Sequence, residues 1–271
     1  MSSIMEHSRL ETALDGARRR DRRVFMPFIT AGDPHLDRTE ELVAAMRRGG
    51  ADIIELGVPF SDPLADGPVI QRASSRALKN GTTMRQILDL AGRMRGNGTL
   101  GATPLVLLLY YNTVYVYGEE RFARDAAAAG VDGVVIPDLP LEAGGSLRSM
   151  CNKTGLTMIA IVTPTTSVDR IKMITDNAEG FIYYTAVTGV TGIREGLRQE
   201  LMGEIKQLKQ LTNLPVLLGF GISNSQQARQ AAAFADGIIM GSALVELIEN
   251  SLGSEMPKLI ERFVREIKQV I

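Results

Sequence analysis

The sequence predicts an α/β protein, a (β/α)8 TIM barrel formed as a single domain over residues 1–271, with an extra helix at its N-terminus. Three observations predict this fold. Eight short apolar runs recur along the chain, segments with helical spacing separate them, and 271 residues is a common length for one such barrel. A doubly wound sheet usually has fewer strands and a glycine fingerprint after the first strand. The first run here ends in Thr30-Ala31-Gly32-Asp33-Pro34, which lacks that fingerprint.

The extra N-terminal helix is expected over about 4–20, before the barrel begins. Leu10, Ala13, Leu14 and Ala17 recur at helical spacing, and the arginine-rich segment 18–23 follows them. A helix dipole stabilises cations at the C-terminal end of the helix. The segment is therefore interpreted as a helix end rather than as a nucleic-acid site or a targeting signal.

The eight expected strands are rich in Val, Ile, Leu and Phe and are bounded by Gly, Pro or Asp. They cover residues 24–30, 52–56, 104–111, 132–136, 157–162, 180–185, 215–219 and 236–240. Between the first two, Leu42, Val43 and Met46 form a helical stripe that ends at Gly49 and Gly50. Further helices are expected at 122–129, 167–177, 197–211, 224–234, 243–248 and 257–270, whereas the glycine-rich segment 92–103 is expected to be a loop.

The composition excludes several classes of function. A net charge of −1 gives no general attraction for nucleic acid or an anionic membrane, and no stretch is long enough to span a membrane. The single cysteine, Cys151, excludes an internal disulfide and fits a reducing cytoplasm. The two histidines, His7 and His35, do not lie near a Cys or Glu at ligand spacing, so no metal site is expected.

A barrel places its chemistry at the C-terminal ends of the strands, where Glu55 is the first candidate. It follows the apolar pair Ile53-Ile54 and precedes an acidic, proline-rich turn. No Lys or Arg lies on any expected strand, so the cation that would make Glu55 part of a buried ion pair is missing. Burial without a cation raises a carboxyl pKa, which suits proton transfer near neutral pH. Asp66 lies in the following loop, where turn chemistry and a functional role are equally good interpretations.

Glycines follow the seventh and eighth expected strands, at Gly221 and at the pair Gly241-Ser242. In barrels, the loops after these strands often bind phosphate through backbone N–H groups at a helix N-terminus. The Ser and Asn at 223–224 could cap the first of the two following helices, and Ser242 could cap the second. These glycines could also serve tight turns alone. Together with Gly192 in the preceding loop, they favour a phosphate site.

Four further residues lie at or near strand ends, where they would wall a cavity suited to a flat apolar ligand: Phe28, Leu108, Tyr110 and Tyr183. Each alone fits an ordinary barrel core equally well. The segment 187–192 is interpreted either as a surface loop or as a mobile lid over the site. All lysines fall in expected helices or loops, which disfavours a Schiff-base aldolase. What remains is acid–base chemistry by carboxylates on a phosphorylated substrate.

Six motifs resemble the tryptophan synthase α chain family. They are FMPFITAGDP (25–34), ELGVPFSDPLADGPVIQ (55–71), GVVIPDLP (133–140), TGVTG (188–192), GFGIS (219–223) and GSALV (241–245). The motifs occur in the family's order over nearly the whole chain, and the second is highly specific. The family is a (β/α)8 barrel within a carbon–oxygen lyase complex, and its own reaction is an aldol-type C–C cleavage of indole-3-glycerol phosphate to indole and glyceraldehyde 3-phosphate.

The resemblance implies a role for each candidate position. Glu55 matches the family's acid–base glutamate, Asp66 its catalytic aspartate that accepts the indole N–H, and Thr191 the lid threonine that contacts this aspartate on closure. The phosphate site is matched by Gly192, Gly221, Gly241 and Ser242, and the indole pocket by Phe28, Leu108, Tyr110 and Tyr183.

The resemblance also implies a partner. The family forms an α2β2 complex in which the α chain holds no cofactor, and the β chain uses pyridoxal phosphate to join indole to serine. The surfaces that match contacts with the β chain are the loops around Asp62, Pro63, Asn112, Asp138 and Pro140. The lid reads AVTGVTG where some members carry an arginine and a serine, which implies coupling of a different strength.

Three other interpretations stay open on the residues alone. The chain could be a free-standing lyase that releases indole without a partner, a phosphosugar isomerase on the same barrel, or a regulatory subunit without activity of its own. An isomerase of this kind typically needs two acid–base groups on opposed strands, and the sixth expected strand carries no carboxylate.

Overall fold

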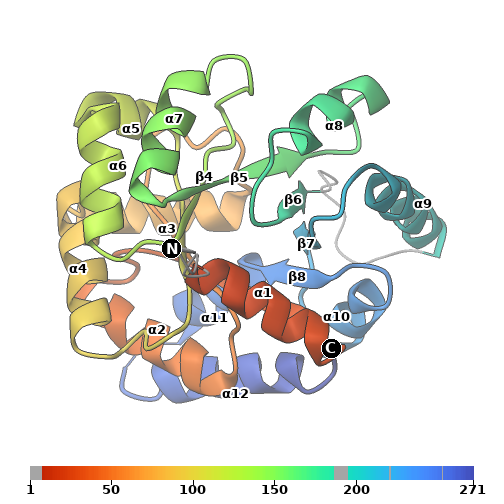
Figure 1. Ribbon diagram of the computed structural model, residues 1–271. Coiled ribbons are helices and arrows are strands. Elements are labelled where there is room, and N and C mark those ends of the chain that lie inside the picture. Colours follow the sequence, from red (N-terminus) through yellow and green to blue (C-terminus); the bar gives the residue numbers. More distant parts are fainter. Residues whose placement is uncertain (1–7, 186–194, 220, 252) are drawn as a thin grey trace, which may run out of the picture.

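The computed structural model describes residues 8–185, 195–219, 221–251 and 253–271, in which parallel strands close into a barrel in the order β1 to β8 (Figure 1). The predicted (β/α)8 fold is therefore confirmed. The strands are β1 (Val24–Thr30), β2 (Ile54–Gly57), β3 (Leu105–Leu108), β4 (Gly133–Val135), β5 (Thr157–Val162), β6 (Ile182–Thr185), β7 (Val216–Gly219) and β8 (Gly237–Met240).

Helices surround the barrel and follow the strands in the chain. They are α1 (Arg9–Arg19), α2 (Leu36–Gly49), α3 (Pro68–Lys79), α4 (Met84–Gly96), α5 (Tyr111–Tyr117), α6 (Glu119–Ala128), α7 (Gly145–Thr154), α8 (Val168–Thr175), α9 (Glu195–Leu211), α10 (Ser225–Ala232), α11 (Ser242–Asn250) and α12 (Met256–Lys268). None of these helices is long and apolar enough to cross a membrane in the part of the chain that the structure describes.

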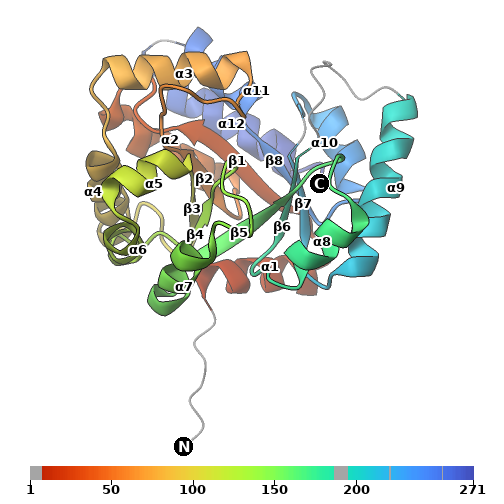
Figure 2. The same ribbon diagram turned by 90° about the horizontal axis from the view of Figure 1, so that it is seen from above.

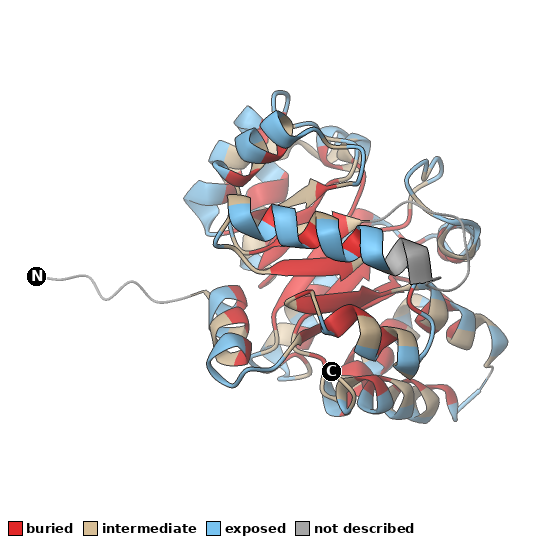
Figure 3. Cartoon of the chain, turned by 90° about the vertical axis from the view of Figure 1, so that its right-hand side faces the viewer, coloured by how far each residue is buried: buried red, intermediate tan, exposed pale blue. Residues whose placement is uncertain are grey.

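Side chains alternate between two apolar layers along the strands, because successive residues of a strand point to opposite faces. Met26, Ile53 and Val106 belong to the inner layer that fills the barrel. Phe25 and Ile54, their chain neighbours, belong to the outer layer that packs against the helices. Figure 3 shows the result: the strands are mostly buried, whereas the outer helices are buried on one side only.

The N-terminal helix α1 lies across the N-terminal end of the barrel (Figure 2). Ser8 caps it, because its Oγ accepts the Glu11 N–H at 3.1 Å while the Glu11 carboxylate accepts the Ser8 N–H at 3.0 Å. The helix α1 therefore begins at Arg9, and residues 4–7 of the expected range lie outside the described residues. Its buried side chains join the inner layer of the barrel, and these are Leu10, Leu14 and Ala17.

Asp132, at the start of β4, fastens this end of the molecule. Its carboxylate accepts hydrogen bonds from Arg9 Nε at 2.7 Å, from Arg95 Nη2 at 2.9 Å and from the Leu105 N–H at 2.8 Å. Arg95 also donates to three backbone carbonyls, so it joins α4 to the loops below the barrel. The hydrogen bonds to Asp132 therefore join α1 and α4 to the start of β4, and these side chains serve a structural role at the N-terminal end of the barrel.

The segment 92–103 is a loop only in its second half, since α4 continues to Gly96. A capping box between Thr83 and Gln86 starts this helix, and buried apolar residues continue at helical spacing as far as Met94. A Cβ on Gly92 would meet only Ala129 Cα, at 3.9 Å, so this glycine lies where α4 approaches the end of α6. A glycine inside a helix lowers its stability without ending it.

The third strand ends at Leu108, not at residue 111, because Tyr111 begins α5. The Tyr111 N–H donates to Asp138 Oδ1 at 2.8 Å, a contact between segments that are distant in sequence. The helices α3, α4, α5 and α7 were absent from the expected pattern, and Ile70 in the first turn of α3 lines the site.

Candidate active site

A cavity of about 180 Å³ opens at the C-terminal ends of the strands, the end of the barrel opposite α1. Eight of the predicted site residues line it: Phe28, Glu55, Asp66, Leu108, Tyr183, Gly221, Gly241 and Ser242. These residues come from β1, β2, β3 and β6, from the segments that precede α3, α10 and α11, and from the first residue of α11. Two further predicted residues, Thr191 and Gly192, lie outside the described residues.

Glu55 points into the barrel because β2 alternates, with Ile54 and Leu56 facing the outer layer. Its neighbours in register are Phe28 on β1 and Val106 on β3, both apolar. The Glu55 side chain is 0% exposed, and neither carboxyl oxygen has a hydrogen-bond partner among the residues that the structure describes. Burial, and secondarily the charge of Asp66, raises the pKa of Glu55 from 4.5 to about 8. The carboxyl is therefore protonated at neutral pH and free to transfer its proton.

Asp66 reaches the same cavity from the turn between β2 and α3. Its N–H donates to the Pro63 carbonyl at 3.0 Å, which closes the turn and directs the carboxylate toward the pocket. Burial raises the pKa of Asp66 from 3.8 to about 6, while the Tyr110 hydroxyl, as a hydrogen-bond donor, opposes this rise. The two carboxyls therefore differ in protonation state at neutral pH: Asp66 is ionised and Glu55 is neutral.

Tyr110 is not among the residues that line the cavity, although it lies next to it. Its hydroxyl accepts the Ala65 N–H at 2.9 Å, and its ring stacks on Phe60 with centroids 5.0 Å apart. Both contacts are with the segment that carries Asp66. Tyr110 therefore fixes the backbone of the acidic turn from behind the pocket.

The apolar wall of the pocket depends on glycines that leave room for aromatic rings. A Cβ on Gly57 would lie 2.5 Å from Phe28 Cζ, and one on Gly241 would lie 3.0 Å from Phe28 Cδ1. Both values are shorter than ordinary contacts of a Cβ, so the Phe28 ring occupies space that only these glycines provide. Tyr183 is placed in the same way, since a Cβ on Gly219 would lie 2.8 Å from its ring.

Two helices direct their N-termini at the far side of the cavity. The N-cap of α10 is Asn224, whose side chain accepts the Gln227 N–H at 3.0 Å. The N-cap of α11 is Gly241 and has no side-chain cap, so Ser242 is the first helical residue and does not serve as the predicted cap. The unpaired N–H groups of an uncapped helix start favour an anion.

Seven lining residues were not predicted as site residues from the sequence: Ala65, Gly67, Ile70, Gly219, Ile222, Ile239 and Met240. Ile239 could have been found from the alternation of β8, because it belongs to the inner layer of the barrel. Ile70 lies in the first turn of α3, a helix whose start is marked in the sequence by Gly67-Pro68.

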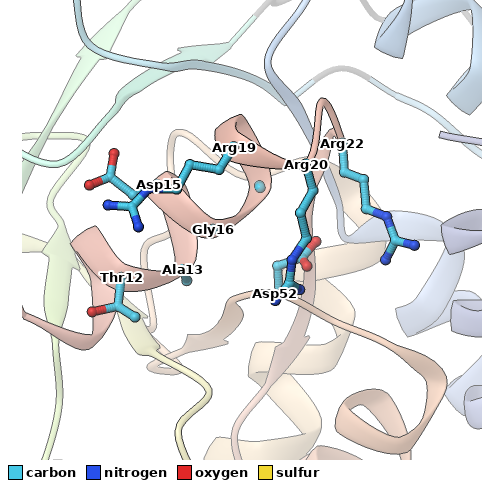
Figure 4. Close-up of a pocket in the computed structure, with 9 residues that line it drawn as sticks. Thr12, Ala13, Asp15, Gly16, Arg19, Arg20, Arg22 and Asp52 are labelled. Atoms are coloured by element: carbon cyan, nitrogen blue, oxygen red, sulfur yellow. The ribbon is translucent and has the colours of Figure 1, made fainter.

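A larger cavity of about 390 Å³ lies at the other end of the barrel, between α1 and the loop before β2 (Figure 4). Arg19, Arg20 and Arg22 line it, together with Asp52, whose carboxylate is held by Lys268 at 2.6 Å. Figure 4 shows the three arginine side chains pointing in different directions. Neither Glu55 nor Asp66 lines this cavity. In the part of the chain that the structure describes, no group of three or more His, Cys, Asp and Glu side chains could hold a metal.

Beside the pocket mouth, large apolar side chains are exposed. Leu64 in the acidic turn is 93% exposed, and Tyr115 and Val116 on α5 are 68% and 77% exposed. Exposed apolar groups this prominent mark candidate contact surfaces. The residues predicted to meet a partner are also at this rim, with Asp62, Asn112, Asp138 and Pro140 exposed and Pro63 partly exposed.

The chain is similar to proteins of one family along nearly its whole length. A family model described as tryptophan synthase alpha chain matches residues 14–270. The chain is 44% identical over 264 residues to the tryptophan synthase alpha chain of Geobacter sulfurreducens, covering 97% of this chain and 99% of that one. It is 43% identical over 265 residues to that of Caldanaerobacter subterraneus, with 97% and 100% covered. The crystal structure of tryptophan synthase subunit alpha from Legionella pneumophila superposes with a TM-score of 0.88 at 34% identity, covering 97% and 98%.

Proposed function

The chain belongs to the tryptophan synthase alpha chain family, and we propose from this premise that Glu55 and Asp66 are the reacting carboxyls of its lyase reaction. That reaction cleaves indole-3-glycerol phosphate to indole and glyceraldehyde 3-phosphate. The observation that carries the assignment is the buried Glu55 carboxyl, which has no hydrogen-bond partner in the described part of the chain and faces the same cavity as Asp66. A carboxyl kept neutral at pH 7 is suited to donate a proton.

In the proposed reaction, Glu55 donates one proton to the substrate and accepts one proton from it. Its carboxyl, with a pKa of about 8, gives its proton to C3 of the indole ring. The carboxylate so formed accepts the proton of the hydroxyl on the carbon next to the ring. As that oxygen becomes the aldehyde carbonyl, the C–C bond breaks and its electron pair returns to the ring. Indole and the aldehyde leave, and Glu55 is protonated again.

Asp66 takes the complementary role. With a pKa of about 6 it is ionised at neutral pH, so it can accept the indole N–H and stabilise the positive charge that forms on the protonated ring. Phe28, Leu108 and Tyr183 supply the apolar wall against which the ring lies. Thr191 is proposed to contact Asp66 when the site closes, as the family resemblance implies.

The phosphate group is proposed to bind at the uncapped start of α11 and at Gly221. None of the described residues lies within 4 Å of a Cβ built on Gly221, so their packing does not require a glycine there. A ligand that approaches the backbone closely would require one. Gly241 and Ser242 supply backbone N–H groups at the helix start, and Gly192 completes the proposed set.

We further propose a β chain as partner, in an α2β2 assembly. The exposed apolar residues Leu64, Tyr115 and Val116 lie at the same rim as the loops around Asp62, Pro63, Asn112, Asp138 and Pro140, and this continuity supports the surface. The α chain itself is proposed to work without a cofactor, with pyridoxal phosphate held by the β chain. The buried thiol of Cys151 supports a reducing, cytoplasmic location.

The direct test of the function is indole release from indole-3-glycerol phosphate by the purified chain, with and without a β chain. We expect indole and glyceraldehyde 3-phosphate in equal amounts, co-elution of the two chains, and faster cleavage in the complex. Cleavage that is unaffected by the β chain, without co-elution, would instead support a free-standing lyase.

The pH dependence tests the protonation states. We expect kcat/KM to follow a bell-shaped curve with an optimum at about pH 7. Activity falls below about pH 6 because Asp66 becomes protonated, and above about pH 8 because Glu55 loses its proton. The two apparent values belong to the pair, since the charge of Asp66 raises the pKa of Glu55. Initial rates between pH 5 and 9.5 measure the curve, and a flat alkaline side would contradict the role of Glu55.

A further inference from the structure

Two neighbouring helices, α3 and α11 (Figure 2), both begin at the pocket. α3 begins at Pro68, directly after Asp66 and Gly67, and α11 begins at Ser242. Ala73 on α3 and Val245 on α11 pack with Phe28 in one small apolar cluster. The distance between the indole end and the phosphate end of the pocket therefore depends on how these two helices lie against each other.

Farther along the same helices, Glu249 of α11 is bound by two arginines of α3. Arg72 donates to both carboxylate oxygens, at 2.9 and 2.7 Å, and Arg76 Nη1 donates to Oε1 at 2.7 Å. The hydrogen bond from Arg72 is the main cause that lowers the pKa of Glu249 to about 2. The bridge thus keeps its charges over the whole range in which the enzyme works. We call these three residues the α3–α11 clamp.

Arg76 also connects the clamp to the barrel. Its Nε and Nη2 donate to both carboxylate oxygens of Asp33, at 2.7 and 2.8 Å, and Asp33 is 1% exposed. Asp33 follows β1, the strand that carries Phe28. One guanidinium therefore holds α3, α11 and the end of β1 in a fixed arrangement. Such bidentate contacts define orientation as well as distance.

We propose that the α3–α11 clamp determines specificity for substrate length, because it sets the spacing between Asp66 and the phosphate-binding start of α11. The inference rests on the proposed function. It identifies the ligand that this spacing selects, which is an indole and a phosphate separated by three carbons. None of the three clamp residues lines the cavity. They act as positioning residues, through the two helices whose starts carry the binding groups.

The spacing should affect the binding free energy of a linked ligand but not that of either half alone. Indole alone needs only the Asp66 end, and glycerol 3-phosphate alone needs only the α11 end, so neither senses the spacing. A linked ligand must satisfy both ends at once, and its advantage over the two halves depends on their distance and orientation. Loosening the clamp should therefore weaken the linked ligand selectively.

The test uses the full chain with Glu249→Gln, which keeps the shape of the side chain and leaves the Arg76–Asp33 contact intact. Calorimetry measures indole, glycerol 3-phosphate, and an indole joined to phosphate by three or by four carbons. We expect unchanged binding of both halves, about tenfold weaker binding of the three-carbon ligand, and a smaller preference for three carbons over four. kcat/KM should fall by the same factor, with kcat little changed.

Arg72→Gln is the second variant, because it removes the other arm of the clamp and also spares Asp33. Glu261→Gln is the matched control, since Glu261 likewise accepts from two arginines, Arg48 of α2 and Arg265 of α12. Neither α2 nor α12 begins at the pocket.

Equal weakening of all four ligands, or the same change in Glu261→Gln, would show that the clamp only stabilises the fold. Unchanged binding of the three-carbon ligand in both clamp variants would overturn the inference and leave the proposed function intact. Failure of that ligand to bind the wild-type chain would instead count against the proposed function.

Discussion

Replacing Glu55 by Gln should lower the rate of indole release by about a thousandfold, the middle of the range for loss of a general acid–base group. The substitution keeps the shape of the side chain but removes the carboxyl that is proposed to give a proton to C3 and to recover one from the hydroxyl. The fall should appear in kcat, because the residue acts on the reacting atoms. A discontinuous assay of indole formed, with Glu261→Gln as control, measures it. Undiminished indole production would exclude Glu55 as the catalytic group.

The same variant should be more stable than the wild type at alkaline pH. Between pH 4.5 and about 8 the folded chain keeps a proton on Glu55 that the unfolded chain releases. Wild-type stability therefore falls as the pH rises through this window and is constant above it. Gln does not titrate, so the variant does not lose stability in this way. The free energy of unfolding of the variant minus that of the wild type should therefore be larger at pH 9 than at pH 4, by up to about 5 kcal/mol. Urea unfolding at both pH values measures this gain. An equal difference at the two pH values would show that the Glu55 pKa is not raised.

Replacing Asp66 by Asn should lower kcat by about a hundredfold, comparable to removing one electrostatic contact to a transition state. Asn can still accept the indole N–H, but it carries no negative charge to balance the protonated ring. The acid side of the pH curve, which we assign to Asp66 with its pKa of about 6, should disappear in the variant. Rate measurements from pH 5 to 7 decide this. An unchanged acid side would assign that titration to another group.

Asp89→Asn is the control for Asp66→Asn. Asp89 is exposed on α4, away from the pocket, and the change in charge is the same. Its rate and its pH curve should match those of the wild type. A shared loss in both variants would point to a general effect of net charge and not to a role of Asp66 in the reaction.

Much of the barrel could be predicted because its signals are local. Each strand is an apolar run of a few residues between Gly, Pro or Asp, and the absence of Lys and Arg on the strands identified Glu55 as an unpaired buried acid. Both features are visible without knowing which segments meet. The resemblance to the family then supplied what the local pattern left open, above all for Asp66.

The missed features depend on contacts between distant segments. Tyr111 begins a helix although its sequence continues the apolar third strand, and its N–H meets Asp138 from the next βα unit. Gly92 lies inside α4 and does not end it. At this position the helix approaches Ala129. Tyr110 does not line the described cavity and contacts Phe60 and Ala65 of the acidic turn, so its place at the indole stays a prediction. None of these partners can be identified from sequence spacing alone.

The pairing of β1 with β8 has a consequence for synthesis of the chain. Val24 to Pro27 bond to Gly237 to Met240, so one edge of the first strand stays unpaired until almost the entire chain has left the ribosome. At about 5–20 residues per second, the intervening roughly two hundred residues take on the order of 10–40 s to make. During that time an apolar strand edge is open to other chains. The nascent protein is therefore a natural client for chaperones, and truncations before β8 should aggregate rather than accumulate as folded fragments.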